Sequence, residues 1–247
     1  MVGTLVSVVI PAYNEESRIW ATLQRVVAYL RTRSYGWEVV VVDDGSTDAT
    51  SDLVNQTVAN EASVRLIQLP HYGKGAALRE GMEKATGQYL FLCDADLAMP
   101  IDQLSRFLPP LLSDFDVAIG SRDIPGSRRF GEPRLRRFQG RVFNVLVRLL
   151  VVSGFKDTQC GFKIIRSDIA SQLLPLQRVK GFGFDVELLF LARRKGFQVI
   201  EVPIDWCYRD RSRIRPFRDP FAMFKELLLI RWNQLRGLYS YKTDYTA

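Results

Sequence analysis

The sequence predicts an α/β protein built on a parallel, doubly wound sheet, as one large domain with at most a small appendage. The chain has 247 residues, and a single domain usually takes ~100–200. Short apolar runs rich in β-branched residues alternate with segments whose apolar residues recur at helical spacing. Acidic clusters directly follow two of these runs. Ligands of such sheets bind at the carboxyl ends of the strands, so these clusters mark the expected site.

The first half of the chain alternates predicted strands and helices. Leu5–Ile10 is an apolar run that ends at Pro11, and Trp37–Val42 is a second one that ends at two aspartates. Both runs are typical of buried parallel strands. Between them, the apolar residues from Ile19 to Leu30 keep helical spacing. Further strands are expected at Val64–Leu69, Tyr89–Cys93 and Asp116–Gly120, and further helices at Asp48–Asn60, Lys74–Thr86 and Asp102–Leu112.

The second half is less regular. A loop at Ile124–Pro133 precedes a helical pattern at Arg137–Val152. The elements expected after it are strands at Gly161–Ile165 and Val199–Ile204, a helix at Asp185–Lys195 and an amphipathic helix at about Pro220–Tyr239.

Composition removes several classes of function. The single histidine, His71, excludes histidine-rich metal sites, and any histidine-based catalytic device would have to use it. The 3 cysteines form no CxxC pair, so neither a disulfide framework nor a structural zinc site is expected. The chain shows no signal-peptide pattern and no apolar run of ~18 residues. We therefore expect a soluble or peripheral protein.

The net charge of +7 comes from two arginine-rich segments in the second half. Residues 122–148 contain eight arginines and two acidic residues, and residues 209–218 contain five arginines and one. Neither segment contains lysine. The planar guanidinium group forms paired hydrogen bonds with phosphate. Phosphate, anionic lipid and nucleic acid are therefore the partners to consider.

Two carboxylates separated by one residue follow the predicted strand at Tyr89–Cys93. In an extended chain, residues i and i+2 point to the same side, so the carboxylates of Asp94 and Asp96 converge. Such a pair suits a hard divalent cation whose shell phosphate oxygens complete. The alternative is a pair of loop-capping aspartates, because the D-x-D spacing alone is common.

Two more motifs follow predicted strands. Asp43 and Asp44 come directly after Trp37–Val42, and a carboxylate there can accept hydrogen bonds from a nucleobase or ribose. Turn and cap chemistry is the alternative, and it accounts for the glycine and serine that follow. Pro11-Ala12-Tyr13-Asn14-Glu15 comes after the first strand, and its tyrosine can stack on a base.

Together, these three motifs resemble those of the inverting family 2 glycosyltransferases of GT-A fold. That resemblance implies a Rossmann-like, mostly parallel sheet with helices on both faces, to which this chain adds a C-terminal amphipathic helix. It also implies that the first two motifs hold the nucleoside of a nucleotide sugar, and that D-x-D holds Mg²⁺ or Mn²⁺ on its diphosphate. The donor-binding residues would be Pro11, Tyr13, Glu15, Asp43, Asp44, Lys74, Asp94 and Asp96, with the metal on Asp94 and Asp96. Leu97-Ala98-Met99 follow, so no third protein ligand is expected there.

Other motifs resemble the polyprenyl-phosphate sugar transferase branch, which includes dolichyl-phosphate glucosyl- and mannosyltransferases. They are His71–Ala77, Gly120–Arg122, Asp157–Lys163 and Phe184–Glu187. Asp157–Lys163 and a further motif, Ser212–Pro216, are closer to the glucosyl type. The resemblance implies transfer of glucose from UDP-glucose to polyprenyl or dolichyl phosphate with inversion. The alternatives are a GDP-mannose-dependent mannosyltransferase, a glycosyltransferase with a non-lipid acceptor, and a polyanion-binding module. Nucleic acid is not expected as a partner, because the acidic motifs would repel it.

The resemblance also suggests roles in the second half. Asp157 is the family's candidate for a general base. However, a phosphate monoester with a pKa near ~6 is mostly dianionic at pH 7, so this residue can instead orient the acceptor or a basic side chain. Arg122, Arg137 and Arg141 are expected to bind the lipid phosphate, and Arg209 and Arg213 the donor diphosphate or the lipid headgroup.

We expect residues 1–219 to form one catalytic domain, with a nucleotide-sugar half at 1–121 and an acceptor half at 122–219, followed by an amphipathic helix and tail at 220–247. Apolar stripes opposite basic residues at Arg137–Val152 and Pro220–Tyr239 are typical of helices that lie in a lipid headgroup layer. Packing of these stripes on the sheet is the alternative. The expected location is therefore peripheral, at the cytoplasmic face of a membrane. The sequence does not predict an oligomeric state.

Overall fold

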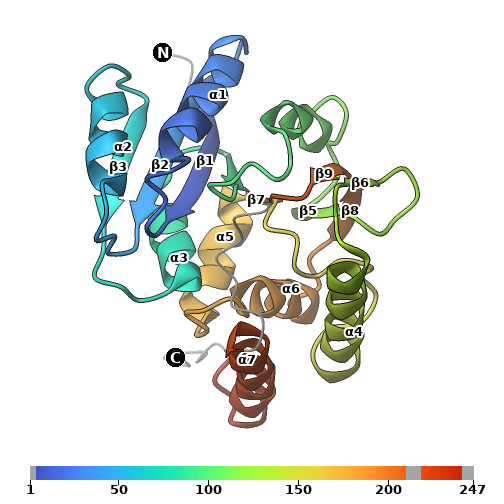
Figure 1. The fold of residues 1–247 in the computed structure, drawn as a ribbon. Coiled ribbons are helices and arrows are strands. Elements are labelled where there is room, and N and C mark those ends of the chain that lie inside the picture. Colours follow the sequence, from blue (N-terminus) through green and yellow to red (C-terminus); the bar gives the residue numbers. More distant parts are fainter. Residues whose placement is uncertain (1–3, 210–217, 241–247) are drawn as a thin grey trace, which may run out of the picture.

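The computed structural model describes residues 4–209 and 218–240 (Figure 1). Its strands are β1 (Thr4–Ala12), β2 (Gly36–Asp43), β3 (Val64–Gln68), β4 (Tyr89–Leu92), β5 (Val117–Ser121), β6 (Arg128–Phe130), β7 (Lys163–Arg166), β8 (Val199–Pro203) and β9 (Asp205–Cys207). Its α-helices are α1 (Ile19–Arg31), α2 (Thr50–Val58), α3 (Lys74–Lys84), α4 (Arg134–Leu150), α5 (Ser167–Leu173), α6 (Phe184–Arg194) and α7 (Arg218–Leu235), and the short 3-10 helices are η1 (Ile101–Phe107) and η2 (Leu174–Leu176).

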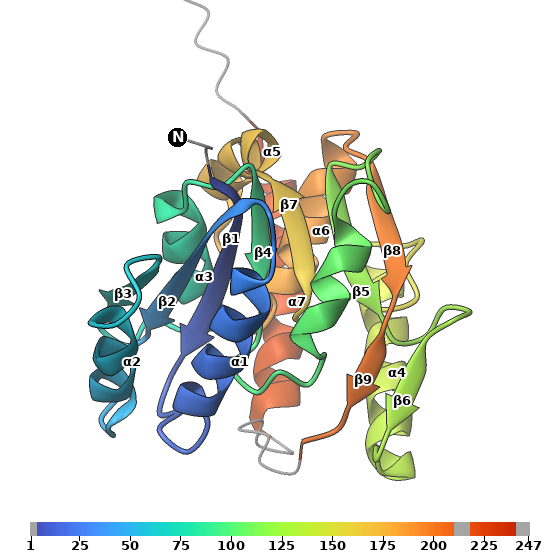
Figure 2. The same ribbon diagram turned by 90° about the horizontal axis from the view of Figure 1, so that it is seen from above.

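One mostly parallel sheet organises the described part of the chain. Its strand order is β3-β2-β1-β4-β7-β5-β8, and β7 runs antiparallel to both of its neighbours. Helices α1 and α2 with η1 cover one face, and α3, α5 and α6 cover the other (Figure 2). The predicted fold class, a mostly parallel sheet with helices on both faces, is confirmed.

The central strands are apolar along their whole length because both of their faces are buried. Val8 and Val39 point to the face covered by α1, whereas Val9, Val40 and Val42 point to the face covered by α3 and α6. All five side chains are fully buried. This arrangement produces the uninterrupted β-branched runs of the sequence.

Several predicted elements have different bounds in the structure. The helix expected at Asp102–Leu112 is only the 3-10 helix η1, because Pro109 and Pro110 supply no N–H donors for a longer one. The helix expected from Arg137 begins three residues earlier, directly after Pro133. Helix α5 and the small sheet that pairs β6 with β9 were not predicted.

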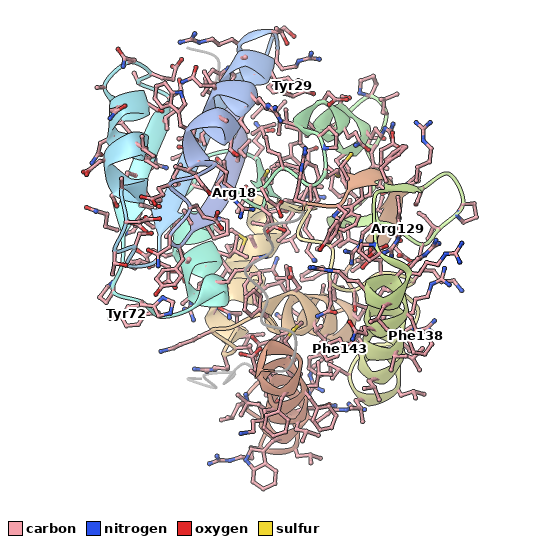
Figure 3. The ribbon with its side chains drawn as sticks, in the orientation of Figure 1. Arg18, Tyr29, Tyr72, Arg129, Phe138 and Phe143 are labelled. Atoms are coloured by element: carbon pink, nitrogen blue, oxygen red, sulfur yellow. The ribbon has the colours of Figure 1, made fainter. Side chains whose placement is uncertain are left out.

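The apolar stripes of α4 and α7, which lie side by side, face solvent. On α4 the exposed residues are Leu135, Phe138, Val142, Val145, Leu146 and Leu149. On α7 they are Phe221, Leu228, Leu229, Trp232 and Leu235. Phe138 lies on the outer side of α4 and Phe143 on the side nearer α6 (Figure 3). The alternative prediction, that these stripes pack on the sheet, is therefore wrong. None of the helices within residues 4–209 and 218–240 is long and apolar enough to cross a membrane.

A buried carboxylate on β2 ties three neighbouring segments together. Glu38 Oε1 accepts hydrogen bonds from Ser7 Oγ on β1 and from the Thr86 amide before β4, both at 2.6 Å. Its Oε2 accepts one from Arg65 Nη2 on β3 at 2.7 Å. Burial would raise the pKa of Glu38, but these hydrogen bonds together hold it below its ordinary value.

We predict that Glu38→Ala lowers the free energy of unfolding by about 3 kcal/mol at pH 7, because the substitution removes the acceptor of the buried Ser7 hydroxyl and also the partner of Thr86 and Arg65. The folded-state pKa of Glu38 lies below the unfolded one, so this stabilisation is present at neutral pH and is lost as the pH falls through the folded-state value. Urea denaturation at pH 7 and at successively lower pH measures both effects. The control is Glu83→Ala, which removes an exposed i,i+4 pair with Arg79 on α3. Equal effects of the two substitutions would contradict the prediction.

Candidate active site

The three motifs that follow β1, β2 and β4 meet at one edge of the sheet. In the sheet, β1 lies between β2 and β4 and is parallel to both. The loops after these strands are therefore neighbours. The Asn14 amide donates to Ser46 Oγ at 2.8 Å, and the Glu15 amide donates to Thr50 Oγ1 at 2.7 Å. The first two motifs are thus joined directly by hydrogen bonds.

Asp94 and Asp96 lie just past the end of β4, in a turn where the Leu97 amide donates to the Asp94 carbonyl at 3.2 Å, so the extended geometry expected for this pair is wrong. Asp94 Oδ1 accepts a hydrogen bond from Lys74 Nζ, the first residue of α3, at 2.6 Å. Burial would raise the pKa of Asp94, but the charge and hydrogen bond of Lys74 hold it below its ordinary value. The pKa of Asp96 is raised by burial and by the negative charge of Asp94. One positive side chain thus serves two neighbouring carboxylates.

Gly161 explains how Asp94 can lie so close to the loop before β7. A Cβ at this position would overlap the Asp94 carboxylate, so any larger residue would push that carboxylate away. The adjoining cavity is lined by both aspartates and by Cys160, Phe162 and Trp206. Burial raises the pKa of the Cys160 thiol to about 11, so this cysteine is not a thiolate at neutral pH.

Asp43 and Asp44 are buried and hold the turns around them. Asp43 Oδ1 accepts a hydrogen bond from the Ser46 amide at 3.0 Å. Asp44 accepts hydrogen bonds from the amides of Tyr72 and Gly73, both at 2.8 Å. The second of the two carboxylates therefore fixes the approach of the loop that leads to Lys74. Turn chemistry accounts for both aspartates within the protein.

Tyr13 lies on the exposed side of this edge and stacks on His71, with ring centroids 4.1 Å apart. His71 Nδ1 is 3.0 Å from Asp44 Oδ2. Glu15 is paired with Arg18 at 2.7 Å, and Pro11 belongs to β1. The stacking role of the single histidine was not predicted, since nothing in its sequence neighbourhood points to Tyr13.

Asp157 is bound on both oxygens by one arginine. Arg122 Nε lies 2.6 Å from Asp157 Oδ2, and Arg122 Nη2 lies 2.9 Å from Oδ1. Burial would raise the pKa of Asp157, but Arg122 lowers it to about 2. The same ion pair raises the pKa of Arg122 despite burial. Its guanidinium carbon lies 5.4 Å from the centre of the Trp206 ring.

The other predicted arginines are less enclosed. Arg141 Nη2 lies 3.7 Å from Oδ1 of Asp123, the residue that follows Arg122 in the chain. Arg137 is exposed one helical turn earlier on α4, and Arg209 is exposed after β9. Arg213 lies outside the described residues. The structure thus links Arg141 to the segment that contains Arg122.

A second buried cation was not predicted. Lys163 is fully buried at the start of β7, and its Nζ lies 2.8 Å from Asp185 Oδ1 on α6. It also donates to the Cys160 carbonyl. The lysine holds the backbone on which Gly161 sits. The motifs that contain Lys163 and Asp185 are evident in the sequence. The pairing of the two residues was not predicted, because they are 22 residues apart in the chain.

Comparisons with known proteins agree with this geometry. The profile of the family described as "Glycosyl transferase family 2" matches residues 7–174. The chain is 32% identical to dolichyl-phosphate beta-glucosyltransferase of Dictyostelium discoideum, covering 96% of this chain and 77% of that one. It is 35% identical to the Saccharomyces cerevisiae enzyme and 33% identical to the human one, in each case over 94% of this chain and 76% of the relative.

The fold also matches solved structures. Glucosyl-3-phosphoglycerate synthase from Mycobacterium tuberculosis in complex with UDP superposes with a TM-score of 0.67 at 22% identity, covering 92% of this chain and 79% of that chain. A structure of the same synthase with Mn²⁺, UDP and glucosyl-3-phosphoglycerate superposes with a TM-score of 0.67 at 19% identity, covering 94% and 80%. At these identities the match supports the GT-A fold alone.

The buried Arg122–Asp157 pair predicts a large effect on stability. We expect Asp157→Asn to lower the free energy of unfolding by about 3–5 kcal/mol, because it leaves a buried guanidinium without its counter-charge. Asp168→Asn is the control, since Asp168 pairs with Arg166 where both side chains are about half exposed, and such pairs contribute about 0–1 kcal/mol.

Denaturation at pH 7 measures both variants. The folded-state pKa of Asp157 is about 2, below its ordinary 3.8, so its charge-dependent stabilisation persists above pH 4 and is lost only as the pH falls toward 2. A loss no larger than that of Asp168→Asn would contradict the prediction.

Proposed function

The chain belongs to glycosyl transferase family 2 and is a glycosyltransferase, and from this premise we propose that it transfers glucose from UDP-glucose to polyprenyl or dolichyl phosphate, with inversion. One observation carries the proposal. Relatives named for this activity align along nearly the whole chain, through both the donor motifs and the Arg122–Asp157 segment.

The residues at the end of β4 fit a divalent cation, Mg²⁺ or Mn²⁺. Asp94 and Asp96 supply carboxylate oxygens from one turn, and burial together with the negative charge of Asp94 raises the pKa of Asp96. Within the described residues no group of three or more histidine, cysteine or acidic side chains could hold a metal. Diphosphate oxygens of the donor would complete the shell. When bound, such a cation stabilises negative charge on a leaving diphosphate.

The chain's own residues would divide the remaining work. Residues 1–121 would bind the nucleotide sugar, with Tyr13 and the Asp43–Asp44 loop at the nucleoside and Lys74 at the diphosphate. Residues 122–219 would bind the acceptor, and residues 220–247 would supply the amphipathic helix and tail. An oxygen of the acceptor phosphate attacks the anomeric carbon, and the bond from that carbon to the β-phosphate oxygen breaks. UDP leaves with the bonding electrons.

Asp157 would act by orienting Arg122. Both of its oxygens already accept hydrogen bonds from that guanidinium, and its pKa of about 2 keeps it ionised at neutral pH. The acceptor phosphate, with a second pKa near ~6, needs no base at pH 7. Arg122 would then face the acceptor phosphate together with Arg137 and Arg141. Arg209 and Arg213 would lie nearer the donor diphosphate or the lipid headgroup.

The exposed apolar faces of α4 and α7 support peripheral contact with a membrane. Apolar side chains such as Phe138 and Trp232 are 65% and 58% exposed, and arginines of α4 accompany them. A helix with this distribution lies in the headgroup layer of a bilayer. We place the protein at the cytoplasmic face, where a nucleotide sugar is available to it.

We predict that the purified protein transfers radiolabelled glucose from UDP-glucose to a short polyprenyl phosphate in the presence of Mn²⁺ or Mg²⁺. Asp94→Asn and Asp96→Asn should each lower kcat by roughly 10²-fold or more, the scale of a lost electrostatic contact to the leaving group. Asp102→Asn, an exposed aspartate in the first turn of η1, is the control.

The alternatives give different results in the same assay. Transfer from GDP-mannose but not from UDP-glucose would support the mannosyltransferase, and transfer only to a soluble phosphorylated acceptor would support a non-lipid acceptor. No transfer, with binding to polyanions, would support the binding module. Transfer at the unaltered rate by a protein that lacks both aspartates would exclude the metal site.

For membrane contact, we predict that the protein floats with vesicles that contain anionic lipid at low salt. It should detach at 0.1 M salt and above, where the screening length falls to ~10 Å or less and the attraction between its arginines and the lipid weakens. Phe138→Ser combined with Trp232→Ser should abolish flotation, because both side chains would contact lipid. Trp20→Ser is the matched control, since Trp20 is 41% exposed on α1, on the other face of the sheet. Flotation that is unchanged in the double variant would contradict the prediction.

A further inference from the structure

Helix α7 carries apolar side chains on its protein-facing side and on its exposed side. Its apolar residues Leu228, Trp232 and Leu235 face solvent, while Leu227 and Ile230 are fully buried against the protein. Asn233 is buried, and Tyr239, which follows the helix, is also buried. The helix therefore packs on the protein through apolar side chains, presents other apolar side chains outward, and adds polar contacts to the loop below it.

Glu226 of α7 makes the central contact. Its Oε2 accepts a hydrogen bond from the Gly183 amide at 2.6 Å. A Cβ at Gly181 would overlap the Glu226 carboxylate, and one at Gly183 would lie 2.9 Å from it. The two glycines thus leave room for the carboxylate against the backbone of the loop. Burial raises the pKa of Glu226, as does the nearby charge of Glu187.

A second contact fixes the other end of the same loop. Tyr239 Oη donates a hydrogen bond to Glu187 Oε1 at 2.5 Å. Glu187 is fully buried in the first turn of α6, and its other oxygen accepts from the amides of Arg178 and Val179 at 2.9 and 2.8 Å. Segment 178–183 is therefore held between α6 and α7.

The loop in turn holds the first turn of α3. The Lys180 carbonyl accepts hydrogen bonds from the amides of Gly75 and Ala76 at 2.7 and 3.1 Å. A Cβ at Gly73 would lie 2.6 Å from that carbonyl, and one at Gly75 would lie 2.9 Å from the Gly181 carbonyl. Lys74 lies between these two glycines, and its Nζ reaches Asp94 at 2.6 Å.

We propose that Glu226 is a positioning residue for glycosyl transfer. It fixes segment 178–183 against α3, and so holds Lys74 on Asp94. The same helix carries this inward contact and the outward apolar side chains. This proposal rests on the proposed function, because it assigns the residue to that same site.

The test compares Glu226→Ala with Glu226→Gln, whose amide oxygen can still accept the Gly183 N–H. We expect Glu226→Ala to lower kcat for glucose transfer by roughly ten- to hundredfold, the scale of a small misplacement in the site. The KM for the lipid and flotation with vesicles should stay unchanged, because the outer face of α7 is intact. Glu226→Gln should restore kcat to within about threefold of the unaltered protein. Gln234→Ala is the matched control, since Gln234 interacts with Arg231 on α7.

A second readout does not depend on transfer. The rise in Tm produced by Mn²⁺ with UDP should be smaller in Glu226→Ala than in the unaltered protein and in Glu226→Gln. If the unaltered protein shows this rise but transfers no glucose to lipid, the proposed function fails while the role of Glu226 is still tested. If Glu226→Ala does not fold, Gly183→Ala disturbs the same contact from the loop, and the same loss is expected. Unchanged kcat and an unchanged rise in Tm in the folded variants would overturn the proposal, as would a loss confined to flotation.

Discussion

The repulsion between two carboxylates, Asp94 and Asp96, is the constraint on which the rest of the site depends. Both lie in the turn that follows the buried strand β4, and burial strengthens their repulsion since little water screens them. Burial and this repulsion together raise the pKa of Asp96. Lys74 offsets part of it from α3, and Gly161 leaves the space in which Asp94 lies. A site that concentrates negative charge in this way favours a cation together with its phosphate ligand.

The neighbouring segments use the opposite arrangement, in which buried cations are fully paired. Arg122 is matched by Asp157, and Lys163 by Asp185. Such pairs contribute little net stability, because desolvation offsets much of their attraction. These pairs do fix the positions of their side chains, because movement of one partner would leave the other as an unpaired buried charge. The chain therefore holds Arg122 rigidly against Asp157, while at the end of β4 two carboxylates lie close to one lysine.

The sequence predicted those features that depend on local pattern and strand order. Uninterrupted β-branched runs revealed the strands, and three motifs at strand ends had to meet once the strands were parallel. Contacts between residues that are distant in the chain could not be predicted from the sequence. The pairing of Arg122 with Asp157 spans 35 residues, so the role of Asp157 stayed open between base and orienter. The antiparallel direction of β7 and the stacking of Tyr13 on His71 likewise depend on tertiary packing.

Helix α7 shows why periodicity alone is insufficient. Its apolar stripe is evident in the sequence, but a stripe does not reveal which side faces the protein. In the structure the inward side carries Glu226 and Asn233 among buried apolar residues, while Trp232 and Leu235 are 58% and 81% exposed. Exposed apolar area is unfavourable by roughly 25 cal/mol per Å², so the fold forgoes that stabilisation on one side of α7. A bilayer would recover it. The polar contacts to the 178–183 loop lie on the inward side of α7, which lipid bound to the outward side would not touch. One helix can therefore bind lipid and position the donor site at the same time.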